Sequence, residues 1–154
     1  MQLVAGHPPD QLPVVRELFL EYASSLGVDF NFQGFDQELA GLPGKYAPPS
    51  GRLLLAMDGQ RAAGCVAVRE LESGIGEMKR LYVRPPFRGQ GAGRQLAVAT
   101  VVAAREIGYQ RLRLDTLATL KPALALYESL GFQRIAPYYH NPIANVVFLE
   151  LRLR

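Results

Sequence analysis

The most constraining stretch of the sequence is the point where a strand pattern stops and a helix pattern begins. Residues 75–83, IGEMKRLYV, are typical of a strand, and Pro85 and Pro86 end it because proline has no amide hydrogen to donate to a sheet. Apolar side chains then recur at helical spacing over residues 93–107, and Gly108 follows as a C-terminal cap. Three glycines at alternate positions lie between the prolines and this helix. The sequence therefore predicts a strand, a tight glycine loop and a helix in succession.

The rest of the chain alternates between strand and helix patterns. Asp58-Gly59 favours the positive φ angles of a hairpin turn, so the strands on either side of it should pair antiparallel. Strand patterns also occupy residues 2–5, 52–57, 62–70, 111–116, 132–135 and 145–153, and helix patterns occupy residues 12–26, 36–40 and 122–130. We therefore expect one domain, residues 1–154, of the α/β (α+β) class, with a mixed, largely antiparallel sheet flanked by helices.

Composition narrows the choice of ligand. A chain of 154 residues can bury one core without disulfides or metal, and its net charge of +3 is too small and too scattered for a nucleic-acid partner. No apolar run reaches the ~18 residues that span a membrane, and the start lacks the pattern of a secretion signal. The lone Cys65 cannot form an internal disulfide and is expected to pack as a small hydrophobe. These features favour a cytoplasmic protein with a small anionic ligand.

The glycine loop, RGQGAGR at residues 88–94, invites comparison with phosphate-binding patterns. A P-loop needs a lysine and then a hydroxyl residue after its last glycine, and neither follows Gly93. A dinucleotide fingerprint needs a third glycine where Arg94 stands, although Asp115 at the end of the next strand leaves this alternative open. Both patterns bring backbone N–H groups close to a phosphate at a helix start, where the helix dipole favours negative charge. We expect this loop to hold an anion in the same way.

Three features together resemble the GNAT family of N-acetyltransferases. RGQGAG, residues 88–93, matches the coenzyme A pyrophosphate loop of that family, Arg/Gln-x-x-Gly-x-Gly/Ala, and stands between a strand and a helix. ALALYESLGF, residues 123–132, resembles the family segment Ala-x-x-Leu-Tyr-x-x-x-Gly-Phe, and Glu77 precedes the loop by the spacing of a strand glutamate in histone-acetylating members. The resemblance implies a V-shaped split between strands 4 and 5, which are here residues 77–83 and 111–115.

The resemblance also implies acetyl-CoA (coenzyme A) as the cofactor and assigns residues that bind it. Leu81, Tyr82 and Val83, at the exposed edge of their strand, would pair with the pantetheine arm. An amide in this edge would polarise the thioester oxygen. The pyrophosphate would be held by backbone amides of Arg88, Gly89, Gln90, Gly91, Ala92, Gly93 and Arg94.

By the same resemblance, two side chains move protons and no metal is required. Tyr127 would protonate the departing sulfur, and Glu77 would take the proton of the attacking amine through water. Each residue has a structural alternative. Tyr127 lies on an apolar helix face and could belong to the core, whereas Glu77 could pair with Lys79 or Arg80. His140 is the alternative base, because histidine titrates near neutral pH.

One position departs from the family pattern. Many members carry asparagine three residues before the alanine of the second segment, where this chain has Leu120, so any contact made by that asparagine is in question. Thr119 or Lys121 could take its place. Residues 30–46, FNFQGFDQELAGLPGKY, also look like a segment of many small bacterial acetyltransferases of unassigned substrate. The resemblance therefore says little about the acceptor.

Other residues near the expected site are open between two roles. Arg84, Arg88 and Arg94 either contact phosphate or are ordinary surface charge. Asp115 either caps the following turn or lines the acceptor cleft. Tyr138, Tyr139 and Asn141 stand where, by the family resemblance, residues often shape the acceptor side, but this Pro-flanked segment with its two tyrosines could equally pack as a loop lid.

Two functions of different classes are compatible with these residues. The first is an acetyl-CoA-dependent N-acetyltransferase that acts on a primary amine of a small molecule or peptide, without nucleic acid or membrane, as a monomer or homodimer. The second is a non-catalytic module that binds acyl-CoA or a nucleotide and regulates a partner. A pure binding module needs no proton-transfer groups. The presence of both Tyr127 and Glu77 beside an intact loop therefore favours the enzyme.

Overall fold

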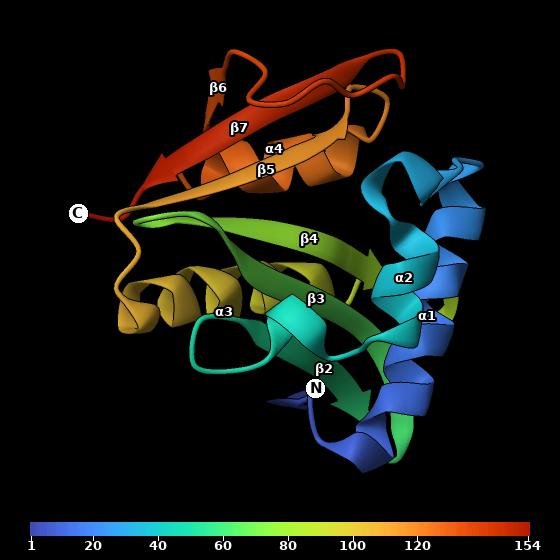
Figure 1. Ribbon diagram of the computed structural model, residues 1–154. Coiled ribbons are helices and arrows are strands. Elements are labelled where there is room, and N and C mark those ends of the chain that lie inside the picture. Colours follow the sequence, from blue (N-terminus) through green and yellow to red (C-terminus); the bar gives the residue numbers. More distant parts are fainter.

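The computed structural model describes residues 1–154, apart from the side chain of Gln33. Within the described residues, seven strands form one sheet in the order β1-β2-β3-β4-β5-β7-β6 (Figure 1). The strands are β1 Gln2–Ala5, β2 Arg52–Asp58, β3 Arg61–Glu72, β4 Ile75–Val83, β5 Arg111–Leu117, β6 Gln133–Ile135 and β7 Val146–Arg152. Neighbouring strands are antiparallel except for the parallel pair β4 and β5. The predicted mixed, largely antiparallel sheet is confirmed.

Helices cover both faces of this sheet. The α-helices are α1 Leu12–Leu26, α2 Phe35–Ala40, α3 Ala92–Ile107 and α4 Lys121–Ser129. Short 3-10 helices are η1 Pro9–Gln11, η2 Phe30–Gln33, η3 Gly44–Tyr46 and η4 Pro85–Phe87. The glycines expected to end α1 and α3, Gly27 and Gly108, do so with φ angles of 64° and 106°. Among the described residues, no helix is long and apolar enough to cross a bilayer.

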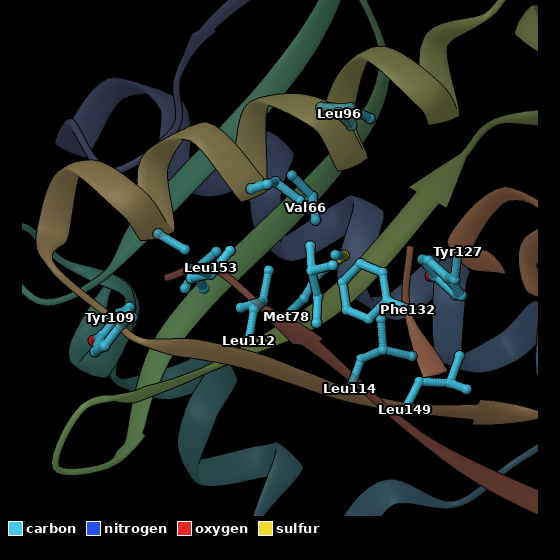
Figure 2. Packing of buried hydrophobic residues seen from close by; sticks show 14 of the residues in the cluster. Val66, Met78, Leu96, Tyr109, Leu112, Leu114, Tyr127, Phe132, Leu149 and Leu153 are labelled. Carbon is cyan, nitrogen blue, oxygen red and sulfur yellow. The ribbon is translucent and has the colours of Figure 1, made fainter. Parts of the chain in front are cut away.

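Two separate cores lie on the two faces of the sheet because side chains alternate along each strand. Val66, Val68 and Met78 pack with α3 and α4 in one core, part of which Figure 2 shows. Their strand neighbours Cys65 and Ala67 pack with α1 and α2 in the other core. Cys65 is fully buried there, as the sequence predicted.

The sheet opens between β4 and β5. These strands pair only at residues 75–77 with residues 111–113, after which β5 continues along β7 through residue 117 (Figure 1). The V-shaped split expected between the fourth and fifth strands is confirmed. Beyond the last pair, the β5-facing edge of β4 has no strand partner in the part of the chain that the structure describes.

A bulge in β4 lies just past this opening. The register between β3 and β4 shifts between the pairs Cys65–Tyr82 and Ala67–Lys79, and Arg80 has a φ angle of 63°. A non-glycine residue at positive φ is uncommon and marks a local distortion of the strand. The bulge interrupts the regular pairing of β3 with β4 beside the split.

Candidate active site

A cavity of about 520 Å³ passes through the split in the sheet. On the α3 and α4 side it is lined by the glycine loop and by Leu126 and Tyr127 of α4. On the α1 and α2 side its walls include Tyr22 and Phe30, which belong to the other core. The strands β4 and β5 form the rim between the two sides. One continuous space therefore joins the glycine loop to the opposite face of the sheet.

The glycine loop presents backbone rather than side chains to the cavity. Gly89 and Gly91 have φ angles of 81° and 83°, a conformation that glycine adopts readily and other residues do not. Gly91 is the N-cap of α3, and no side chain caps the helix there. The first amides of an α-helix have no partner within the helix, and the helix dipole makes this end attractive to anions. Gly89, Gly91, Ala92 and Gly93 line the cavity, so the predicted anion site faces it.

The arginines around the loop take different positions. Arg88 lines the cavity, and its Nε donates to the carbonyl oxygen of Val83 at 2.9 Å. Arg94 reaches across to α4, where Nη1 donates to Ser129 Oγ at 3.0 Å. Arg84 does not line this cavity because Glu17 and Glu21 of α1 hold its guanidinium at 3.0 and 2.7 Å. Of the three, Arg88 is the one placed on the cavity wall.

The free edge of β4 continues the wall from the loop towards the centre of the sheet. Leu81, Tyr82 and Val83 all line the cavity. Among the described residues no strand lies beside this edge past the split, so backbone groups that point away from β3 can pair with an extended ligand, as at any sheet edge, although the Val83 carbonyl already accepts from Arg88. Gln90 of the predicted loop set is exposed and does not line the cavity.

Tyr127 is buried and lines the cavity from α4. Its ring packs edge-on against Phe132 at 5.8 Å between centroids (Figure 2). No described residue hydrogen-bonds its hydroxyl, and no fully buried side-chain oxygen of the described residues lacks a partner, so the hydroxyl must touch the cavity. Burial raises the pKa of Tyr127 far above its ordinary range, so the phenol keeps its proton at neutral pH.

Glu77 lies behind the cavity wall, with 1% of its surface exposed. Arg69 donates to its Oε1 from Nε at 3.0 Å and from Nη2 at 2.9 Å, and the Tyr138 hydroxyl donates to Oε2 at 2.6 Å. Lys79 Nζ is 3.8 Å from Oε1. Burial by itself would raise the pKa of Glu77, but Lys79, Tyr138 and Arg69 together lower it below its ordinary value. The carboxylate is therefore ionised at neutral pH and held in place.

The far wall of the cavity carries Asp115 of β5. The Tyr139 hydroxyl and Asn141 Nδ2 both donate to Asp115 Oδ2, the latter at 3.0 Å. Asn141 lines the cavity, whereas Tyr138 and Tyr139 pack on Phe148 behind it, with ring centroids 5.2 and 5.5 Å away. The aromatic cluster thus packs as a loop support and also positions polar groups of the wall.

Three further expectations concern residues close to α4 and the last loop. Leu120, which stands at the family asparagine position, lines the cavity itself. Thr119 and Lys121, the suggested replacements, do not. His140, the alternative base, is exposed and is not part of the cavity wall. The structure brings together the loop, the edge of β4, Tyr127 and Asp115, and leaves His140 outside.

Two cationic side chains of β4 were left without a role by sequence reasoning. Arg80 is 4% exposed, donates to Glu38 of α2 at 3.0 and 3.2 Å, and lies over the rings of Phe30 and Phe35. Lys79 lines the cavity. In a regular strand, adjacent residues such as Lys79 and Arg80 point to opposite faces. The bulge breaks this alternation, and the sequence contains no pattern from which the bulge could have been predicted.

The split sheet and the glycine loop at the start of α3 lie side by side, as the sequence resemblance to the GNAT family implied. The model of the Acetyltransferase (GNAT) family matches residues 14–132, and the chain belongs to this family. An uncharacterized N-acetyltransferase of Schizosaccharomyces pombe is 46% identical over 147 residues, which covers 94% of this chain and 90% of that protein.

Solved structures share the fold. A GNAT-family acetyltransferase from Staphylococcus aureus has a TM-score of 0.81 and 18% identity, with 99% of each chain covered. The Salmonella typhimurium protein yncA, solved with its cofactor acetyl-CoA, has a TM-score of 0.72 and 18% identity, covering 100% of this chain and 94% of that one. The fold expected from the sequence resemblance is therefore confirmed.

Proposed function

We propose that residues 1–154 act as one acetyl-CoA-dependent N-acetyltransferase domain that transfers an acetyl group to a primary amine of a small molecule or peptide. The observation that carries this proposal is the continuous cavity, which joins the glycine loop and the edge of β4 to the Tyr127 hydroxyl and then to Asp115 on the other side of the sheet. We further propose a cytoplasmic enzyme, a monomer or homodimer, that acts without nucleic acid or membrane.

The cavity fits acetyl-CoA at the loop end. Backbone amides of residues 88–94 would hold the pyrophosphate at the uncapped start of α3, with Arg88 beside them. The edge at Leu81, Tyr82 and Val83 would hold the pantetheine arm, and a backbone amide in this edge would polarise the thioester carbonyl. When bound, acetyl-CoA supplies an acetyl group activated as a thioester. The amine nitrogen forms a bond to the carbonyl carbon, and the carbon–sulfur bond breaks.

Tyr127 is the proposed acid. Its hydroxyl holds a proton at neutral pH and touches the cavity, so Oη can give that proton to the departing sulfur. Buried among apolar side chains, it meets little competition from solvent for this transfer. The family resemblance and the geometry support the same role for this residue.

Glu77 is the proposed acceptor of the amine proton. Its lowered pKa keeps it ionised, as a base must be, but it lies behind the wall, so the proton would reach it through an intervening water. Asp115 lines the cavity directly and is the alternative carboxylate. The pH dependence of a Glu77→Gln variant, described below, separates the two.

Turnover is the experiment that tests the proposal. Thiol release from acetyl-CoA should be followed over a panel of amino acids, polyamines, aminoglycosides and short peptides, with hydroxyl compounds as the control acceptors. We expect release that depends on an amine and forms an N-acetyl product. Tight binding of acetyl-CoA without release to any amine would instead support the non-catalytic acyl-CoA-binding module.

A further inference from the structure

Lys79 is the buried cation for which the proposed mechanism has no use. It is 8% exposed, lines the cavity, and approaches Glu77 Oε1 at 3.8 Å, which is too long for a hydrogen bond. No hydrogen bond from Nζ exists among the described residues, and none of their fully buried side-chain nitrogens lacks a partner. The ammonium group therefore touches the cavity with its hydrogens free for an acceptor.

The other cations of the wall are already engaged. Arg80 is bonded to Glu38, and Arg88 donates to the Val83 carbonyl at the loop end. The oxygens of Glu77 are already taken by Arg69 and Tyr138, which leaves Lys79 with a long contact only. A buried ammonium without hydrogen-bond acceptors is costly, so this position suits an anion that arrives with the ligand.

Lys79 lies on the side of the cavity away from the glycine loop. Met78, its neighbour, packs in the core of α3 and α4, and Ala67, its partner on β3, packs in the core of α1 and α2. By strand alternation the Lys79 side chain leaves the sheet on the α1 and α2 face. The anion it would bind is therefore not a phosphate held at the loop but a group of the acceptor.

Asp115 occupies the matching position on the opposite strand. Glu77 and Arg113 form the last pair of β4 and β5, and Lys79 and Asp115 are each two residues farther along. Leu114 packs in the core of α3 and α4, so Asp115 also points to the other face. A cation and an anion thus face the opening of the split from its two walls, and no ion pair joins these two described residues.

The electrostatics of the site favour a ligand with both charges. Burial lowers the pKa of Lys79, Glu77 and Asp115 act against this lowering, and Arg80 and Arg69 add to it. A carboxylate placed on Nζ would stabilise the ammonium form. On Asp115, Oδ2 accepts from Tyr139 and Asn141, which leaves Oδ1 for a donor on the ligand.

From this juxtaposition, and building on the proposed acetyl transfer, we infer that the acceptor is an amino acid with an apolar side chain. Its carboxylate binds Lys79 Nζ, and its amine is oriented by Asp115 across the split. The remaining wall on this side is apolar and suits the side chain, with Leu26, Val28, Phe30 and Ile143 lining it.

A matched set of acceptors tests the inference. Leucine, leucinamide and 3-methylbutylamine share one apolar side chain, but the second and third lack the carboxylate. At saturating acetyl-CoA we expect kcat/KM for leucine to exceed that for 3-methylbutylamine by about 100-fold, because a site built for a polar group rejects the analogue without it. Equal values for leucine and 3-methylbutylamine would overturn the inference while leaving acetyl transfer intact. Absence of turnover with every amine tested would instead overturn the proposed function.

The Lys79→Met variant assigns the effect to one side chain. We expect kcat/KM for leucine to fall about 100-fold, mainly through KM, with a much smaller loss for 3-methylbutylamine. Lys79→Arg should recover at least part of the preference for leucine, which also covers the case in which the methionine variant does not fold. Lys45→Met, at an exposed lysine outside the cavity, is the control and should change neither value. Equal losses on both acceptors in Lys79→Met and in Lys79→Arg would show a purely structural role and contradict the inference.

Discussion

The two ends of the cavity are built from different material. The loop end is made mainly of backbone: uncapped amides at the start of α3, two glycines at positive φ and the free edge of β4. The other end, which we propose binds the acceptor and call the acceptor end, is made of side chains, chiefly Lys79 and Asp115, brought together from different strands. A binding site made of backbone groups depends only on local geometry, so one short sequence motif is enough to predict it. A side-chain site depends on how distant segments meet, so it can vary between relatives of one fold.

The largest effect is expected from a substitution in the glycine loop, which should strongly weaken acetyl-CoA binding at the loop end. Gly91→Val forces a β-branched residue into a φ angle of 83° and places a side chain where, in our proposal, backbone amides approach the pyrophosphate. We expect acetyl-CoA affinity, measured by titration calorimetry, to fall by at least ~100-fold. Gly59→Val is the matched control, because Gly59 also has positive φ, at 62°, but lies in the β2–β3 hairpin. If both variants bound like the parent, the backbone account of the loop end would be wrong.

The second effect lies where the two ends meet. Tyr127→Phe removes only a hydroxyl that touches the cavity, so we expect kcat to fall on the order of 10²-fold with acetyl-CoA affinity nearly kept. Tyr109→Phe is the control, since Tyr109 is a buried tyrosine of the same core that does not line the cavity. An unchanged kcat for Tyr127→Phe, under conditions where chemistry limits the rate, would make Tyr127 a packing residue.

Replacing Glu77, which lies behind the cavity wall, should have a smaller effect on kcat/KM, and this effect should depend on pH. If Glu77 takes the amine proton, Glu77→Gln should lose about tenfold in kcat/KM near pH 6, and the loss should shrink towards pH 10 as free amine becomes abundant. A loss that is equal from pH 6 to 10 would mean that Glu77 positions Lys79 and Tyr138 instead, and Asp115→Asn would then be the next variant.

The ionisation of Glu77 does not change the folding stability of the protein within the pH range of this activity measurement. The folded-state pKa of Glu77 is lowered, so the ion pairs of its carboxylate contribute fully above the unfolded pKa and are lost only as the pH falls through the folded pKa. Both values lie at or below the ordinary value of 4.5, which is under the assay range. Urea unfolding of the parent and Glu77→Gln should therefore show a loss of stability that shrinks below about pH 4.

The smallest effect separates the arginines. Arg84→Met should leave acetyl-CoA affinity within about twofold of the parent, because its guanidinium is bound to α1, and should lower the free energy of unfolding by ~1 kcal/mol or less, as partly exposed ion pairs do. Urea denaturation and calorimetry measure the two quantities. A large loss of acetyl-CoA affinity would place Arg84 back among the phosphate contacts.

The features that could be predicted from the sequence are the local, backbone-determined ones, like those of the loop end. Helix ends at Gly27 and Gly108, the strand stop at Pro85 and the glycine loop were all predictable, because each depends on the conformational limits of a single residue. The split was predicted from family resemblance and confirmed by the three-residue pairing of β4 with β5. These features are local or inherited with the fold.

What the sequence did not predict depends on contacts between distant segments. Arg80 meets Glu38 across 42 positions, and Tyr138 meets Glu77 across 61. Lys79 gains its place in the cavity because the strand beside it diverges, which no pattern within IGEMKRLYV encodes. The roles of Glu77 and Tyr127 in catalysis stay predictions, since geometry gives their positions but not their effect on rate.

The measurement that tests the two-ended cavity most directly is steady-state kinetics with both substrates varied, on Arg88→Met and Lys79→Met. Arg88 lies at the loop end and Lys79 at the acceptor end. We predict that Arg88→Met raises KM for acetyl-CoA, by roughly tenfold, and leaves KM for leucine near the parent value, whereas Lys79→Met does the reverse. If Lys79→Met raised KM for acetyl-CoA and left KM for leucine unchanged, the division of the cavity into a cofactor end and an acceptor end would be contradicted.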